Sequence, residues 1–334
     1  MTRKLQFADP AGKCRRRFGR LLFSILLSAT PIPLAHAVTS PQELLAAGQV
    51  DEAIRNLEQQ ITQSPNGAEA YNLLCRADFM IEDWDHGISA CERATKLDPQ
   101  KSVYYLWLGR VAGEKADHVG FVSAASLVGK VRTSFERAVE LDPRNWQART
   151  DLAEFYLEAP AIVGGGKDKA RQQANALLTI NPAAGHLTLA RIAAKEKDNV
   201  NAERECRAAI EASNSGARAW LDLAIFFRHT RRLDDMQEAL RSMESSPLDY
   251  SESLMDGASL LLKSGRDFPL ATRLLRRYLA SPVEEGPAFK AHDMLGELLE
   301  KEGDRRAAAD EYRAALELFH AYAAAQADLK RVER

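Results

Sequence analysis

The sequence predicts an all-α protein built from about seven or eight consecutive pairs of helices. The stretch Ala219–Pro247 shows the pattern most clearly. Its first helix carries apolar or small residues spaced by three, one and three positions, which place them on one helical stripe: Trp220, Leu223, Ala224 and Phe227. After a polar turn, a second apolar stripe follows: Met236, Leu240 and Met243. Proline cannot continue a helix, so Pro247 ends this helical hairpin.

The same pattern recurs along the chain. Proline dipeptides punctuate it at regular intervals: Asp98-Pro99, Asp142-Pro143, Asn181-Pro182, Ser246-Pro247 and Ser281-Pro282. Apolar pairs three or four positions apart precede or follow them: Tyr71 and Leu74, Tyr105 and Leu108, Leu152 and Tyr156, Leu295 and Leu299. This recurrence over Pro41–Ala325 resembles the tetratricopeptide repeat (TPR), with its W-x2-L-G-x2-Y pattern and closing proline. The resemblance implies a right-handed superhelix, an α-solenoid in which each helix-turn-helix unit packs on its neighbours.

The first 37 residues have the features of a signal peptide. Arg15–Arg20 is basic, residues 21–29 form a short apolar run, and Ala35-His36-Ala37 is an A-x-A cleavage site. The apolar run is too short to cross a bilayer as a helix. We therefore expect a bacterial exported protein, cleaved near Ala37 and periplasmic or secreted. Sec export is favoured, and the pair Arg15-Arg16 leaves twin-arginine export as the alternative.

The mature chain is expected to consist of a solenoid at residues 38–320 and a capping helix at 321–334. Removal of the signal peptide leaves 38 basic and 46 acidic residues, a formal charge of −8. An acidic body argues against nucleic-acid binding, which needs a basic face. No membrane span is expected in the mature chain.

Export also affects how the cysteines are interpreted, because disulfides persist in oxidising compartments. Cys75 lies on the first helix of its unit, and Cys91 lies on the apolar face of the second. Antiparallel helices can bring the two within bonding distance. A disulfide and a pair of buried thiols both remain open, whereas Cys206 is expected to be a core residue.

Two units are longer than the rest. The interval from Asp98 to Asp142 is 44 residues and that from Asp142 to Asn181 is 39, against about 34 in the family. The surplus falls in residues 114–131 and 159–166, between the two helices of each unit, so both insertions are expected on one rim of the solenoid. The alternative is a drift in length without function, in which the extra residues extend the helices and pack locally. The candidate residues on this rim are His118, Phe121, Gly164, Gly165, Gly166 and Lys167.

The glycine triplet before Lys167 does not make a phosphate-binding loop. Ala161 stands where such a loop needs its first glycine, and Asp168 stands where it needs Ser or Thr. A flexible turn is favoured over an anion site.

In TPR proteins the first helices line a concave groove. The family positions carried onto this chain select six groove candidates: Asn72, Arg76, Leu106, Arg110, Thr150 and Glu154. Arg76 and Arg110 hold the same position in adjacent units, so their guanidinium groups can converge on a carboxylate. The alternative is that each pairs with a local glutamate, such as Glu69 or Glu114. The family's clamp for chaperone C-termini is absent, because Trp107 stands in place of one of its asparagines.

The sequence offers no catalytic or metal-binding motif, so neither an enzyme nor a cofactor is expected. The family's groove positions in the eighth unit are expected to form a solvated face: Lys290, Asp293, Glu297, Glu300 and Lys301. The first functional hypothesis is an adaptor of the cell envelope that binds a protein or peptide in the groove or on the rim. The second is a small-ligand carrier with an apolar pocket around Phe121, Leu127 and Ile162.

Overall fold

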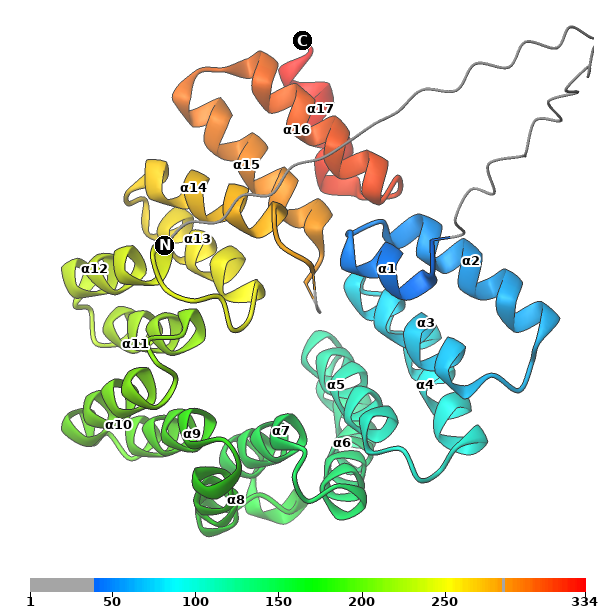
Figure 1. Ribbon diagram of the computed structural model, residues 1–334, viewed down its shortest axis with the longest axis vertical. Helices are drawn as coiled ribbons and strands as arrows, with labels where there is room; N and C mark the ends of the chain where they lie inside the picture. The colour runs from blue at the N-terminus through cyan, green and yellow to red at the C-terminus, as the bar shows by residue number, and fades with distance from the viewer. Residues whose placement is uncertain (1–38, 284–285) are drawn as a thin grey trace, which may run out of the picture. The chain divides into compact units, whose positions relative to one another are not determined.

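Consecutive pairs of antiparallel helices make up this computed structural model, which describes residues 39–283 and 286–334 (Figure 1). The first helices of the eight described pairs are α1 (Pro41–Ala46), α3 (Ala68–Met80), α5 (Ser102–His118), α7 (Trp146–Glu158), α9 (Pro182–Lys195), α11 (Ala217–His229), α13 (Glu252–Ser264) and α15 (Ala288–Glu302). Their partners are α2 (Val50–Gln63), α4 (Trp84–Leu97), α6 (Phe121–Leu141), α8 (Lys167–Ile180), α10 (Asn199–Ala212), α12 (Leu233–Glu244), α14 (Phe268–Leu279) and α16 (Arg305–Leu318). A last helix, α17 (Ala323–Val332), packs on α16.

These pairs confirm the predicted all-α fold of helix-turn-helix units. The predicted signal peptide and its cleavage site lie outside the described residues. No helix in residues 39–283 and 286–334 has the length and apolar character that crossing a bilayer requires.

Side-chain caps mark where several helices begin. Asp198 and Asp304 each accept a hydrogen bond from the backbone N–H three residues later, at 3.1 and 3.0 Å. Asn181 does the same at the start of α9, where Pro182 occupies the first helical position. A short polar side chain satisfies an N–H group that the helix itself leaves without a partner. The recurring proline at Asn181-Pro182 therefore both ends one unit and begins the next.

Small residues on the first helices allow the second helices to approach closely. A Cβ atom on Gly109 would collide with the ring of Phe135, and one on Gly296 would collide with the ring of Tyr312. Tyr312 is fully buried. The small position of the repeat pattern thus has the packing role that the sequence predicts, at two widely separated units.

The first insertion is not a loop. The surplus residues lengthen α5 to 17 residues and α6 to 21, and only Val119 and Gly120 separate the two helices. Continuous helical hydrogen bonding satisfies the backbone without a projecting segment. The expectation of an insertion between the helices is therefore wrong for this unit, and the alternative of longer helices describes it.

The second insertion does lie between two helices. Residues 159–166 contain a single 3-10 turn, Ala161–Val163, and a left-handed residue at Gly164, with φ of 103°. The carbonyl oxygen of Val163 accepts a hydrogen bond from Arg132 of α6 at 3.3 Å. The loop is thus packed on the preceding unit.

The first and last units of the described chain touch each other. The backbone N–H of Val283 donates to the carbonyl of Ala46 at 2.8 Å, and Gly48 lies against Ala288, whose Cβ would be 2.5 Å from a Cβ at Gly48. An ion pair between Glu82 and Lys290 flanks these contacts, and so does a hydrogen-bond contact of 2.6 Å between Nδ1 of His320 and Oδ2 of Asp51. We call this set the end contact. It brings α1 and α2 beside α15 and α16 (Figure 1), although more than 200 residues separate them.

A disulfide joins Cys75 of α3 to Cys91 of α4, and both side chains are fully buried. A cross-link restricts the unfolded chain, and a loop of 16 residues contributes about 3 kcal/mol in the chain-entropy account. We expect the double variant Cys75→Ser and Cys91→Ser to lose stability of this order in urea unfolding. Reductant should lower the free energy of unfolding of the wild type to that of the variant and should leave the value of the variant unchanged. A wild type that is insensitive to reductant would contradict this expectation.

Candidate binding cavity

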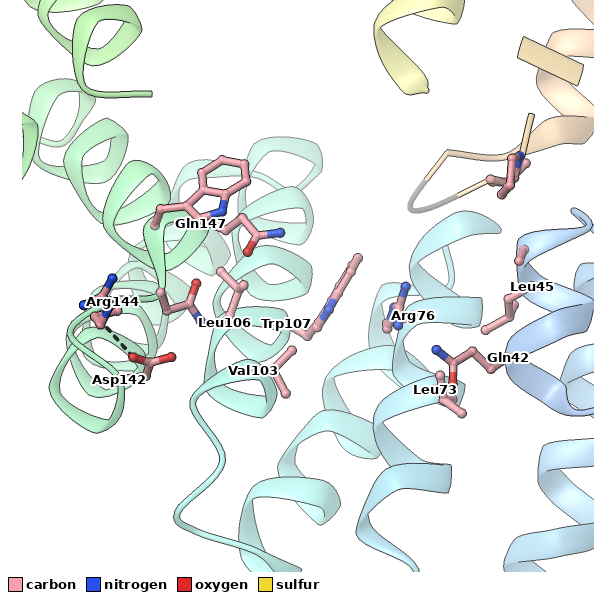
Figure 2. Close-up of a pocket in the computed structure, with 15 residues that line it drawn as sticks. Gln42, Leu45, Leu73, Arg76, Val103, Leu106, Trp107, Asp142, Arg144 and Gln147 are labelled. Carbon is pink, nitrogen blue, oxygen red and sulfur yellow. Dashed lines mark hydrogen bonds between the residues drawn. The ribbon is translucent and has the colours of Figure 1, made fainter. Parts of the chain in front are cut away.

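A cavity of about 630 Å³ opens among the first helices of the N-terminal units. Its described lining comes from α1, α3, α5, the start of α7 and the segment before α15: Gln42, Leu45, Ala46, Leu73, Arg76, Val103, Leu106, Trp107, Asp142, Arg144, Asn145, Trp146, Gln147, Pro282 and Val283. Figure 2 shows Arg76 and Trp107 facing the side chains of α1 across this space. The end contact shapes the cavity, because it brings α1 and Val283 to the same wall.

Trp107 lies between two guanidinium groups. The central carbon of Arg76 and that of Arg110 are each 5.1 Å from the centroid of the Trp107 ring. Both arginines therefore converge on one indole, within the range of cation–π attraction. Arg110 also forms an ion pair with Asp151 of α7 at 2.6 Å, a partner that the sequence analysis did not name.

The opposite wall carries an exposed guanidinium. Arg144 is exposed, and within the described residues its side chain makes no hydrogen bond or ion pair. Its backbone N–H donates to the carboxylate of Asp142 at 2.9 Å, which fixes the turn before α7. Beside it, the central guanidinium carbon of Arg218 lies over the ring of Trp146, 5.5 Å from the ring centroid. The cavity thus combines the half-buried ring of Trp146 with the exposed charges of Arg144 and Asp142.

Farther along the groove, the charged side chains pair with one another across units. Arg191 of α9 bridges Glu154 of α7 at 3.3 Å and Asp222 of α11 at 3.0 Å. Glu154 also borders a second cavity of about 580 Å³. The predicted groove residue Glu154 is therefore engaged within the solenoid and does not line the first cavity.

The remaining groove candidates differ in their surroundings. Leu106 is buried and lines the cavity. Thr150 is buried, and its hydroxyl donates to the carbonyl of Trp146 at 2.9 Å. Asn72 is buried outside the cavity lining, and its amide nitrogen has no hydrogen-bond partner in the described residues. Only Arg76 and Leu106, of the six, contact the cavity directly.

The rim candidates do not form a common site with the groove. The Nδ1 atom of His118 lies 2.8 Å from the carbonyl oxygen of Glu114, and its ring lies 5.7 Å from that of Trp84. The Nζ atom of Lys167 lies 4.0 Å from Oε1 of Glu196. The side chain of Phe121 is outside the described residues. Ile162 is 93% exposed, which argues against a closed apolar pocket around it.

The glycine loop uses its own N–H groups. Gly164 donates to the carbonyl of Ala161 at 3.0 Å, Gly165 to that of Pro160 at 3.2 Å, and Gly166 to that of Tyr156 at 2.7 Å. An anion at this turn would compete with all three bonds. The arrangement matches the favoured interpretation of a turn.

Sequence reasoning missed most of the cavity wall. It noted Trp107 only as a departure from the family's clamp, and it did not select Arg144, Trp146, Gln42 or Val283. The substitution of a large aromatic at a groove position was the available indication. The other four gather only because the units stack and the ends meet.

Comparison with known proteins identifies a repeat family over part of the chain. Residues 44–108 match the tetratricopeptide repeat family. The fold is TPR-like. No curated protein matches the chain.

Among solved structures, yeast Tom70 is similar with a TM-score of 0.53 and 15% identity, over 87% of this chain and 59% of Tom70. This chain therefore spans less than two thirds of Tom70, and the likeness concerns the fold alone. A thermophilic TPR protein of Thermus thermophilus gives a TM-score of 0.47 at 16% identity, over 56% of this chain and 95% of that one. A tetratricopeptide repeat protein of Parabacteroides merdae gives 0.44 at 10% identity, over 88% and 96%.

Proposed function

We propose that the protein is a non-catalytic scaffold of the bacterial cell envelope that binds a protein or peptide partner in the cavity around Trp107. TPR proteins typically bind other proteins, and the TPR match together with the fold supports that general role. The observation that carries the site is the indole of Trp107 held between Arg76 and Arg110 in a cavity that also exposes Arg144. Tryptophan and arginine are the residue types that most often dominate binding energy at interfaces.

Preorganisation supports this role. Stacking on Trp107 holds Arg76, and stacking together with the ion pair to Asp151 holds Arg110. A partner would therefore not need to immobilise these side chains, which lowers the entropic cost of binding. The accessible positive group, Arg144, suits a carboxylate of the partner. The half-buried ring of Trp146 and the exposed side chain of Val103, which also line the cavity, suit its apolar side chains. A peptide with acidic and apolar side chains fits this wall.

Export is part of the proposal. The basic and apolar segments of residues 1–37, with the A-x-A site ending at Ala37, support cleavage and an envelope or secreted location. A buried disulfide between Cys75 and Cys91 is consistent with an oxidising compartment.

The test is partner capture from an envelope extract with matched arginine variants. Arg144→Glu reverses the charge of an exposed cavity residue, so we expect little loss of stability and a loss of affinity of about 10- to 100-fold. Arg276→Glu is the control, because Arg276 is also exposed but lies on α14 outside the lining. Affinity is measured by calorimetry with the purified partner, and stability by thermal unfolding.

A third variant separates the groove from the rim. Ile162→Asp places a charge on the most exposed apolar side chain of the second insertion. Binding that is lost in Ile162→Asp and kept in Arg144→Glu would move the site to the rim. Equal binding by all three variants and the wild type would reject both locations.

A further inference from the structure

Three carboxylates from two helices meet near the C-terminus. Asp293 and Glu297 lie one turn apart on α15, and Asp328 lies on α17. One carboxylate oxygen from each residue lies within 4.8 Å of the others. The spacing of four positions explains why Asp293 and Glu297 share a face, but only tertiary packing adds Asp328.

Asp293 does not belong to a solvated face, contrary to the sequence analysis. Its exposed fraction is only 6%, and its Oδ1 atom has no hydrogen-bond partner in the described residues. Its other oxygen, Oδ2, accepts a bond of 3.3 Å from the hydroxyl of Tyr322. A buried carboxylate oxygen without a donor is costly unless a positive group compensates it. The buried Oδ1 therefore points to a missing cationic partner.

One neighbouring cation already pairs with a member of the cluster. Arg331 of α17 forms ion pairs with both Asp328 and Glu300. Neither Asp293 nor Glu297 makes an ion pair within the part of the chain that the structure describes.

The cluster borders lysines as well as acids. Lys263, Lys290 and Lys301 line the neighbouring pocket together with Asp293 and Glu297, and Lys290 pairs with Glu82.

We propose that Asp293, Glu297 and Asp328 bind a divalent cation of the calcium type, which joins the capping helix α17 to α15. Hard divalent cations take carboxylate and carbonyl oxygens as ligands. Three oxygens within 4.8 Å of one another fit around one Ca²⁺, whose ligand oxygens lie at about 2.3–2.6 Å from the ion. Water can complete the coordination, because Glu297 and Asp328 border an open pocket of about 390 Å³.

The test is calorimetric titration of the whole mature chain with calcium chloride. We expect one Ca²⁺ per chain, with a dissociation constant of about 10⁻⁴–10⁻³ M, the range of weak extracellular sites. Asp293→Asn and Asp328→Asn should each weaken binding at least about tenfold. Asp310→Asn is the control: this exposed acid of α16 pairs with Arg313, outside the cluster.

A second readout tests whether the ion joins the two helices. Amide hydrogen exchange in α17 should slow when Ca²⁺ is added to the wild type and should not change in Asp293→Asn. The same titration with magnesium chloride reports selectivity for the larger ion. Absence of binding at millimolar Ca²⁺, or equal binding by the wild type and both cluster variants, would overturn the proposal.

Discussion

Replacing Gly48 with valine is expected to separate the first and last units of the solenoid. Gly48 has φ of +74°, and a Cβ at this position would lie 2.5 Å from the Cβ of Ala288. The left-handed backbone costs a β-branched residue about 1–3 kcal/mol, and overpacking costs about 1–3 kcal/mol more. Opening the end contact relieves the collision, so we expect the contact to break.

The separation can be measured with spin labels on the two ends. Exposed positions on α2 and α16 are suitable for this purpose, through Gln59→Cys and Glu317→Cys. Double electron–electron resonance should give one narrow distribution of label-to-label distances in the labelled protein with Gly48. In the labelled Gly48→Val variant the distribution should be broader and shifted to longer distances. Because α1 supplies Gln42 and Leu45 to the cavity wall, binding of the partner should weaken as well.

A glycine elsewhere provides the matched control. Gly265 has φ of +65°, and no atom lies within 4 Å of a Cβ built there. Gly265→Val therefore carries the same backbone strain without a collision. It should lower stability and leave the label distance unchanged. An unchanged distance in Gly48→Val would show that the end contact tolerates the added side chain.

The stability of the N-terminal units is expected to fall as pH rises from about 4 to about 7. Asp78 of α3 is 5% exposed, and its Oδ2 atom has no hydrogen-bond partner in the described residues. Burial and then the charge of Asp83 raise the pKa of Asp78 from 3.8 to about 7; Glu58 adds to the rise and His86 opposes it.

The sign follows from proton linkage. Between the two pKa values the folded chain holds the proton of Asp78 and the unfolded chain has released it. Unfolding is therefore favoured increasingly as pH rises through this window. The full pKa shift of Asp78 corresponds to about 4 kcal/mol in the free energy of unfolding. We expect the protein to lose about 2–4 kcal/mol of this stability by the time the pH exceeds 7.

Urea unfolding at several pH values measures this loss. Asp78→Asn removes the titrating group and should flatten the dependence over that window. Asp85→Asn is the control, because Asp85 is exposed and pairs with Lys115, and it should keep the slope of the wild type. An identical slope in Asp78→Asn would assign the effect to another group.

The repeated helical pairs were predictable because each depends on nearby residues. Stripes such as Trp220 to Phe227 have the helical period, and a small residue such as Gly109 must face a large one such as Phe135. Stacking in a solenoid involves only neighbouring units. Its local rules are therefore visible in a pattern that repeats every few tens of residues.

The cavity was only partly predictable. Arg76 and Leu106 follow from the family's groove positions, and both line it. The pairing of Arg110 with Asp151 does not follow from those positions. A side chain on one first helix has several possible partners at similar distances on the adjacent first helices. The surplus residues after Glu114 led to a wrong prediction of an insertion between two helices. A difference in unit length does not indicate whether the extra residues form a loop or lengthen both helices.

The sequence by itself determined the fold class, the helical pairs and the two residues that form the disulfide candidate. Tertiary structure alone decided the end contact, the joining of Val283 to the wall around Trp107, and the meeting of Asp328 with Asp293. These depend on the small rotation between successive units, summed over the whole chain. No local pattern encodes that sum, because each step is set by side-chain packing between neighbouring units.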